Sequence, residues 1–282
     1  MDLKSQKDRL YASWNIHLSC NYRCPYCFFY GKWAKLAKHN RYLSVTEWVE
    51  CWNKIYDQYG SVHIDISGGE PFTYPSFLEL VFEFSKRHTL GIITNLSWDV
   101  EPFVKKISPV RVKVYPSFHP YFANIGSFLR KIIFLKDSGF EISVSCVGYP
   151  PVLKKLLVFK KEFENKRVNF SVQPFRGVYR GVEYPKGYTS EEKEIIVLLC
   201  GDPLAIEYQL EGKITKGRLC SAGQKYIRVH SDSSVFRCAH SKIMGDIMDR
   251  DFKLLEEPLP CESEFCDCKN EFIYLVESTG DG

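Results

Sequence analysis

Early in the chain the sequence reads Ser19-Cys20-Asn21-Tyr22-Arg23-Cys24-Pro25-Tyr26-Cys27, which sets three cysteines in a Cys-x3-Cys-x2-Cys pattern. It follows the alternating, strand-like run from Ala12 to Leu18. Three thiolates on so short a loop can hold three corners of a [4Fe–4S] cluster and leave one iron without a protein ligand. A structural zinc site needs four ligands and an electron carrier needs a fourth cysteine, but residues 28 to 50 contain none. The pattern therefore indicates chemistry at an open iron.

This spacing, with the aromatic Tyr26 before the last cysteine, resembles the signature of the radical S-adenosylmethionine (radical SAM) enzymes. The resemblance implies that Cys20, Cys24 and Cys27 bind the cluster, while SAM chelates the open iron. It also implies that one-electron reduction, by a flavodoxin- or ferredoxin-type protein, yields methionine and a 5′-deoxyadenosyl radical that abstracts hydrogen from a substrate. Tyr26 and Phe28 are expected to flank the adenine of SAM.

The composition is that of an ordinary soluble protein. The 282 residues suffice for one large domain, or for one domain with a small appendage. No apolar run approaches the ~18 residues that a membrane span needs, and the N-terminus lacks the apolar core of a secretion signal. We therefore expect a cytoplasmic protein without a membrane partner. Eleven cysteines in such a chain favour reduced thiols that bind metal over disulfides.

The net charge gives no indication of a nucleic-acid partner. The formal charge is +4, but two [4Fe–4S]2+ clusters held by three and four thiolates would carry −1 and −2 and leave about +1. This is far from the concentrated basic footprint of a nucleic-acid-binding protein. The run from Lys32 to Arg41 has four basic residues and no acidic one, and here a solvated loop is favoured over a binding patch.

The rest of the chain alternates β-rich runs with amphipathic segments. Strands are predicted at Trp14 to Leu18, Val62 to Ser67, Leu90 to Asn95, Val110 to Tyr115, Glu141 to Val147 and Val168 to Gln173. Helices are predicted at Val45 to Gln58, Phe77 to Arg87, Val100 to Ile107, Ile125 to Ser138 and Val152 to Asn165. Six such units predict an α/β fold, a partial (β/α)6 TIM-like barrel over residues 1–185, with its chemistry at the carboxyl ends of the strands.

Unusual residues follow several of these strands. The second strand ends in Gly68-Gly69-Glu70, where the absence of a Cβ allows a ligand to approach the backbone closely. This matches the radical SAM motif Gly-Gly-Glu, whose backbone meets the methionine amino group of SAM. Glu70, with Asn95 and Ser117 at later strand ends, is suited to the methionine and ribose parts of the cofactor.

Two further residues are candidates for catalysis. His119 stands in Ser-Phe-His-Pro after the fourth strand, where binding SAM, touching substrate, acting as a base and fixing the loop all remain open. Arg176, after the sixth strand, is placed to hold an anionic or hydroxylated substrate, and a surface salt bridge is the equally weighted alternative.

A second group of cysteines lies in residues 186–282, the expected second domain. Cys220 and Cys238 flank a predicted hairpin, Lys225 to His230 and Ser234 to Cys238, and three more cysteines follow at Cys261, Cys266 and Cys268. This arrangement resembles the twitch extension of some radical SAM enzymes, a short relative of the SPASM domain, which carries an auxiliary [4Fe–4S] cluster. Cys220, Cys238, Cys266 and Cys268 are favoured as ligands, with Cys261 as a substitute. A zinc knuckle on the same cysteines is the alternative.

The leading hypothesis is therefore an enzyme that oxidises a substrate by two electrons, with the auxiliary cluster as electron acceptor. A small molecule is favoured because the cluster loop begins at residue 20, which leaves no room for the N-terminal peptide-recognition domain that peptide modifiers often carry. The alternatives are a peptide- or protein-modifying enzyme, by cross-linking or epimerisation, and a non-catalytic iron–sulfur or zinc protein. Cys146 keeps a minor role as a hydrogen-atom donor in a redox-neutral reaction, although Cys51, Cys146 and Cys200 fit small buried hydrophobes better.

Overall fold

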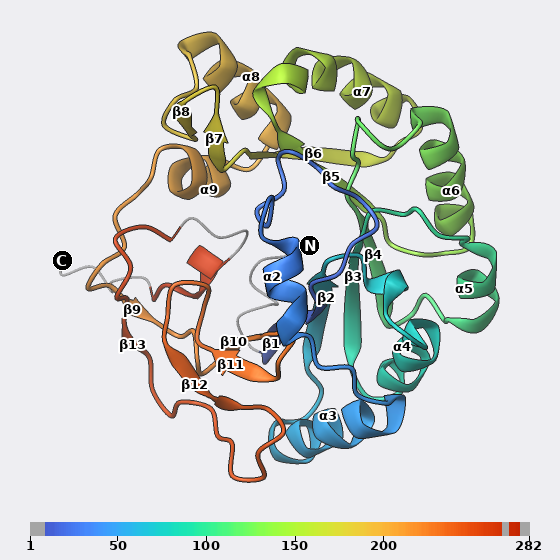
Figure 1. Ribbon diagram of the computed structural model, residues 1–282, viewed down its shortest axis with the longest axis vertical. Helices are drawn as coiled ribbons and strands as arrows, with labels where there is room; N and C mark the ends of the chain where they lie inside the picture. Colours follow the sequence, from blue (N-terminus) through green and yellow to red (C-terminus); the bar gives the residue numbers. More distant parts are fainter. Residues whose placement is uncertain (1–8, 267–270, 277–282) are drawn as a thin grey trace, which may run out of the picture.

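The computed structural model describes residues 9–266 and 271–276, and it has the predicted α/β architecture (Figure 1). Six strands form the wall of a partial barrel: β1 (Tyr11–His17), β2 (His63–Gly68), β3 (Thr89–Thr94), β4 (Val112–Pro116), β5 (Ser143–Gly148) and β6 (Asn169–Pro174). The main helices between and after them are α3 (Val45–Tyr59), α4 (Phe77–Ser85), α5 (Glu101–Lys106), α6 (Ile125–Asp137), α7 (Leu153–Asn165) and α8 (Ser190–Cys200). In Figure 1 these helices surround the strands from outside.

All six strands run parallel, so their carboxyl ends meet at one end of the barrel. β1 to β4 are consecutive neighbours in one sheet, and β5 pairs with β6. Parallel bridges from Val114 to Ile142 and from Ser117 to Ser145 join β4 to β5, which makes the wall continuous. The loops after β1, β2, β3 and β4 are therefore brought together, as the sequence predicts.

The outer face of the first strands is held by large aromatic side chains. Trp14 of β1 is fully buried and packs edge-on against Trp48 of α3, with 4.6 Å between ring centroids. Trp52 of α3 and Phe84 of α4 also contact Trp14. α3 begins with a complete capping box, in which Ser44 and the third-position glutamate exchange hydrogen bonds. The inner residues of β1 and β2 are consequently free to line an interior space.

The hairpin predicted near the second cysteine group is part of the same sheet. β10 (Tyr226–Val229) pairs in parallel with β1, and β11 (Ser234–Phe236) and β12 (Ile243–Asp246) continue from it in antiparallel pairs. The sheet order is β12-β11-β10-β1-β2-β3-β4. The C-terminal part of the chain thus covers the edge of β1 that would otherwise be open.

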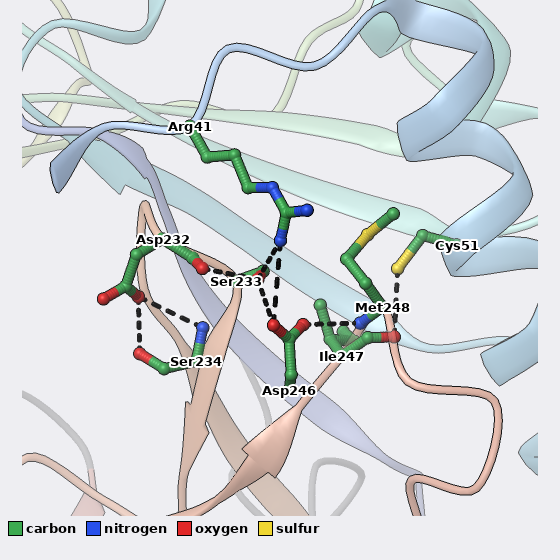
Figure 2. A network of polar contacts seen from close by, with 8 residues as sticks. All are labelled: Arg41, Cys51, Asp232, Ser233, Ser234, Asp246, Ile247 and Met248. Atoms are coloured by element: carbon green, nitrogen blue, oxygen red, sulfur yellow. Dashed lines mark hydrogen bonds and ion pairs between the residues drawn. The ribbon is translucent and has the colours of Figure 1, made fainter.

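A polar network fastens this hairpin to the segment after the first cysteine group (Figure 2). The Arg41 guanidinium donates to the Ser233 hydroxyl at 2.9 Å and lies 3.7 Å from the Asp246 carboxylate. Ser233 in turn donates to Asp246 at 2.7 Å. Nearby, the Cys51 thiol donates to the Ile247 carbonyl at 3.3 Å, so Cys51 is a buried hydrophobe with one weak hydrogen bond, as expected.

Short elements complete the fold. They are α2 (Trp33–Leu36), η1 (Ala37–His39), η2 (Pro71–Thr73), η3 (Pro150–Val152), β7 (Gly177–Tyr179), β8 (Val182–Tyr184), α9 (Pro203–Ala205), η4 (Ile206–Leu210), β9 (Leu219–Cys220), β13 (Leu259–Pro260) and η5 (Glu271–Tyr274). None of the helices in the described ranges has the length and apolar character to cross a membrane.

Candidate functional site

The three cysteines of the first group lie on the loop that follows β1. Cys24 is buried, whereas Cys20 and Cys27 are half-buried. The loop turns tightly, because the Cys27 amide donates to the Cys24 carbonyl at 3.1 Å. Backbone amides also point at two of the sulfurs: Tyr22 N–H at Cys20 Sγ and Phe29 N–H at Cys27 Sγ, each at 3.4 Å. Such donors stabilise a thiolate.

These thiols fit an iron–sulfur cluster. All ten cysteines within the described ranges are free. Burial raises the pKa of each of the three thiols, to about 12 for Cys24, and the Cys20 thiol raises the pKa of Cys24 and Cys27 further. Their thiolates therefore need a cationic partner. No three His, Cys, Asp or Glu side chains in the described part of the chain are grouped tightly enough for a single metal ion. A cluster needs no such group, because each cysteine binds a different iron.

His119 packs directly against the cysteine loop. Its Nδ1 lies 3.4 Å from Cys24 Sγ and 3.2 Å from the Tyr26 hydroxyl. Its ring stacks on Tyr26, with 5.8 Å between centroids, and meets Tyr22 edge-on. Burial lowers the pKa of His119 to about 4, so the imidazole is neutral at physiological pH. Of the roles left open by the sequence, fixing the loop is the one for which the structure has contacts.

The Gly-Gly pair after β2 touches the backbone of the cysteine loop. The Gly69 amide donates to the His17 carbonyl at 2.8 Å, and the Glu70 amide donates to the Ser19 carbonyl at 3.0 Å. A Cβ on Gly69 would stand 1.7 Å from the Ser19 carbonyl oxygen, and a Cβ on Gly68 2.1 Å from that of His17. Only glycine permits this approach. The two glycines thus set the position of the first cysteine relative to the end of β2.

The Glu70 carboxylate is committed to the protein itself. It is 1% exposed and accepts hydrogen bonds from the Thr94 hydroxyl and the Asn95 amide, both at 2.7 Å, and from the Phe72 amide at 3.2 Å. Burial raises its pKa to about 7 in spite of these three donors. Glu70 therefore ties the end of β2 to the end of β3.

Asn95 and Ser117 extend the same connections around the barrel end. The Asn95 side chain donates to Asn21 at 2.8 Å, and Asn21 donates to the Ser97 hydroxyl at 2.8 Å. The Ser117 amide donates to the Thr94 carbonyl at 2.7 Å. The loops after β1, β3 and β4 are thereby joined, and the predicted site residues at these strand ends do lie together.

A cavity of about 410 Å³ lies inside the barrel wall. The cysteine loop contributes Tyr26, Phe28 and Phe29 to its lining, and β6 and the loop after it contribute Gln173 and Arg176. Gly68 and Val147 also line it, whereas the neighbouring Cys146 is buried and does not. The C-terminal part adds a large share of the wall, namely Gln209, Tyr226, Arg228, Ala239, Glu271, Ile273 and Tyr274.

One carboxylate in this lining belongs to the barrel strands. Asp65 of β2 accepts a short hydrogen bond from the Tyr11 hydroxyl of β1. His63 Nε2 lies 3.2 Å from the other Asp65 oxygen, and His63 Nδ1 lies 2.9 Å from the Thr89 hydroxyl. Burial and the Asp65 charge raise the pKa of Tyr11 well above its ordinary value. Tyr11 and Asp65 therefore present a proton donor and a proton acceptor at the cavity surface.

A second carboxylate belongs to the C-terminal part. Glu271, 5% exposed, accepts from the Tyr226 hydroxyl at 2.7 Å, from Arg228 at 3.0 Å and from the Ala239 amide at 3.2 Å. Ala239 directly follows Cys238, so this network connects the cavity wall to the second cysteine group. An isolated acidic residue gives no sequence signal, whether it lies in a strand, as Asp65 does, or in a short helix, as Glu271 does, and for that reason the sequence did not reveal them.

The second cysteine group is assembled from four separate segments. Pairing of β9 with β13 sets Cys220 opposite Leu259, two residues before Cys261. Besides burial, the Cys261 thiol raises the pKa of Cys220, and burial, Glu271 and the thiols of Cys220 and Cys261 raise the pKa of Cys238 to about 11. Cys220 and Cys266 are buried in one apolar cluster, and Cys200, Cys238 and Cys261 pack against it. Cys268 lies outside the described residues.

Together, a parallel α/β barrel wall and three free cysteines after its first strand define a barrel protein whose first loop can hold an iron–sulfur cluster. Residues 14–199 match the Radical SAM superfamily, and the chain belongs to it. This membership carries SAM-dependent radical chemistry and implies a [4Fe–4S] cluster, for which Cys20, Cys24 and Cys27 are the candidate ligands. The family assignment and the partial-barrel fold predicted from the sequence are confirmed.

Individual relatives are more distant. An S-adenosylmethionine-dependent nucleotide dehydratase of Thermoplasmatales archaeon (strain ISO4-H5) is 32% identical over 114 residues, which are 39% of this chain and 38% of the relative. The matched part thus spans little more than a third of that protein. Among solved structures, anSMEcpe with bound AdoMet and the Cp18Cys peptide has a TM-score of 0.60 at 18% identity, covering 86% of this chain and 78% of that one. A histidine-tagged form of anSMEcpe with bound AdoMet has a TM-score of 0.62 at 17% identity, with the same coverage. At these identities the likeness concerns the fold alone.

Proposed function

We propose that this radical SAM enzyme oxidises a small polar molecule by two electrons, with a second [4Fe–4S] cluster as electron acceptor. Cys220, Cys238 and Cys261 would hold that cluster, with Cys266 or Cys268 as the fourth ligand. The observation that carries the proposal is that residues beside both cysteine groups line the same cavity. Tyr26 lines it from the first cysteine loop, and Ala239, the neighbour of Cys238, lines it from the second group. Cys261 is included because the pairing of β9 with β13 sets Cys220 opposite Leu259, two residues before Cys261, and because Cys238 and Cys261 pack on the same apolar cluster as Cys220.

When bound, the first cluster with SAM supplies a 5′-deoxyadenosyl radical that takes a hydrogen atom, and the second cluster supplies an electron acceptor. The chain must do the rest. Oxidation of an alcohol carbon also releases a proton from oxygen, and the Tyr11–Asp65 pair can accept it, because Tyr11 already donates to Asp65. Tyr26, which is buried, lines the cavity beside the cysteine loop and excludes water there.

The lining favours a small substrate with hydroxyl or amino groups. Two carboxylates, Asp65 and Glu271, and two arginines, Arg176 and Arg228, face the cavity, and their formal charges cancel. The other polar groups are neutral donors and acceptors from Ser, Asn, Gln and Tyr side chains. Such a set orients an uncharged or zwitterionic polar molecule by hydrogen bonds.

The test begins with anaerobic reconstitution, which we expect to give about eight irons per chain and 5′-deoxyadenosine when SAM and dithionite are added. Cys24→Ala should abolish SAM cleavage. The Cys220→Ala/Cys238→Ala double variant should retain about four irons and still cleave SAM, but lose product formation. Stoichiometric zinc without sulfide would rule out the enzyme, and a folded double variant that turns over normally would rule out the oxidative role.

Nucleotide dehydration is a second candidate, supported by the similarity to the archaeal dehydratase. A dehydration is redox-neutral and needs no electron acceptor. Incubation with SAM, dithionite and each common nucleoside triphosphate distinguishes the two. Nucleotide-stimulated formation of 5′-deoxyadenosine, unaffected by loss of Cys220 and Cys238, favours dehydration. No stimulation by any nucleotide favours the oxidative proposal.

A further inference from the structure

One arginine of the C-terminal part contacts two of the segments that carry the second cysteine group. Arg237 follows β11 directly and precedes Cys238. Its guanidinium donates hydrogen bonds to four backbone carbonyls, those of Ala222 and Leu259 at 3.0 Å, of Cys220 at 3.4 Å and of Pro260 at 3.5 Å. The guanidinium thus bridges β9, which carries Cys220, and β13, which directly precedes Cys261.

The chemistry of arginine suits this arrangement. A guanidinium presents five N–H groups in a planar fork of fixed geometry, whereas a lysine ammonium is a compact charge on a flexible stem. Here Nε and both terminal nitrogens donate to carbonyls of different segments. The Arg237 side chain is also half-buried, so water competes only in part for these bonds. Arg237 therefore fixes the positions of three backbone segments relative to one another: 220–222, 237–238 and 259–261.

A glycine leaves the room that this side chain needs. A Cβ on Gly223 would stand 2.8 Å from Arg237 Cγ and 2.6 Å from Leu255 Cδ1. The aliphatic stem of Arg237 consequently lies against bare backbone, and a larger residue at position 223 would displace it. Because Gly223 and Arg237 flank β10 on the two sides of the predicted hairpin, this packing also fixes how the Cys220 segment meets Cys238.

We propose that Arg237 is a positioning residue for the second cysteine group. It holds the segments of Cys220, Cys238 and Cys261 together before metal binds, and its charge raises the reduction potential of the cluster bound there. A cluster on four thiolates is an anion, and reduction by one electron makes it more negative. A nearby cation therefore stabilises the reduced form more than the oxidised form. The inference rests on the second cluster of the proposed function and adds to it a residue that is not a ligand.

The test uses a Cys24→Ala background, in which the second cysteine group has a full set of ligands and the first does not. Arg237→Gln removes both the charge and the fork of donors, whereas Arg237→Lys keeps the charge and removes the fork. Arg250→Gln is the matched control, because it removes one positive charge at an exposed position of the same part of the chain. Three quantities are measured: metal content after anaerobic reconstitution, the midpoint potential from an EPR-monitored redox titration, and hydrogen exchange of the metal-free proteins.

We expect Arg237→Gln to bind at most about half of the metal that its parent binds, with a lower midpoint potential for the cluster that forms. Arg237→Lys should also lose metal, but its cluster should keep the parent's potential because the charge is retained. In the metal-free proteins, residues 220–222 and 259–261 should exchange at least about tenfold faster in both variants. Arg250→Gln should match its parent in all three measurements.

Normal metal content in Arg237→Gln would overturn the positioning role, and an unchanged potential would overturn the electrostatic one. Equal losses in Arg250→Gln would also overturn the proposal, because they would show a general effect of charge. Zinc, or no metal, in the parent would contradict the proposed function instead. Hydrogen exchange would then still decide whether Arg237 joins the two segments: faster exchange in the Arg237 variants supports that role, and unchanged exchange refutes it.

Discussion

Gly69 illustrates how a missing side chain positions the reactive loop. Its Cα lies so close to the Ser19 carbonyl that a Cβ would stand 1.7 Å from the oxygen. From the sequence motif alone, Gly69 is explained by the need of SAM to approach the backbone closely. The structure adds a second cause, because the cysteine loop packs on the same position. Substitution should therefore affect both the cluster and SAM.

We predict that Gly69→Ala lowers the iron content of the first site and weakens SAM binding by at least about tenfold, or ~1.4 kcal/mol. Gly126→Ala is the matched control, because its Cβ would be 3.4 Å from the nearest atom and alanine favours the α6 helix. Iron analysis of the Cys220→Ala/Cys238→Ala background, with a SAM titration, measures both effects. Full iron and unchanged affinity in the Gly69 variant would contradict the packing argument.

Glu70, which joins the end of β2 to the end of β3, destabilises the folded protein when its carboxyl group is charged. Its pKa is about 7 instead of 4.5, because burial disfavours the charged form. The folded protein therefore binds a proton more tightly at Glu70 than the unfolded chain does. As pH rises from about 4.5 through 7, this residue takes stability away, up to about 3 kcal/mol.

Glu70→Gln should remove that dependence, because the amide side chain does not titrate in this range. At pH 5 the variant should be less stable than wild type, because the amide cannot accept from both Asn95 N–H and its other donors. At pH 8 the gap should narrow or change sign, since wild type then buries a charge and the variant does not. Urea unfolding of the metal-free proteins at pH 5, 6.5 and 8 measures this. A gap that stays constant across the range would show that Glu70 has no raised pKa.

At the scale of elements, two polar networks hold the C-terminal strands against the barrel, one exposed and one buried. Arg41 contacts the hairpin of β11 and β12, whereas Glu271 of η5 contacts β10. The Arg41–Asp246 pair is about half exposed on both sides, and such pairs contribute ~0–1 kcal/mol. Glu271 is buried and satisfies Tyr226, Arg228 and the Ala239 amide at once. Its loss would remove this shared acceptor from the half-buried Arg228 guanidinium, the Tyr226 hydroxyl and the Ala239 amide.

We therefore predict that Glu271→Ala lowers the free energy of unfolding by about 3 kcal/mol or more, and Arg41→Ala by less than about 1 kcal/mol. Chemical denaturation of both variants alongside wild type provides the comparison. Equal losses would mean that the hairpin is fastened mainly at its outer edge rather than through the cavity wall.

The same elements define what sequence reasoning could reach. Strand positions were predicted to within about three residues, because alternation and the following Gly and Pro residues are local signals. The pairing of β10 with β1 was not predicted, since nothing local in Tyr226 to Val229 specifies a partner so far away. The α8 helix begins at Ser190 and is capped by Thr189 through a capping box with Glu192, and periodicity alone cannot identify such a cap.

For the whole molecule, the sequence predicted the chemistry from the cysteine patterns, but it did not predict most of the residues that surround the site. Cys20, Cys24 and Cys27 were identified because their spacing alone has meaning. Asp65, Arg228 and Glu271 became visible only when three distant segments met around one cavity. His119 illustrates the middle case, because its position after β4 was evident, whereas its contact with Cys24 required the fold.

The parallel pairing of β1 with β10 also bears on how the enzyme is made in the cell. Tyr11 and Tyr226 are partners although they are 215 residues apart. At roughly 5–20 residues per second, a ribosome needs about 10–40 s to deliver the second strand after the first. Until then β1, and the cysteine loop that follows it, lack one neighbour. Installation of iron and sulfide is thus best timed after translation ends, and an assembly machinery would meet a nearly finished barrel rather than a nascent chain.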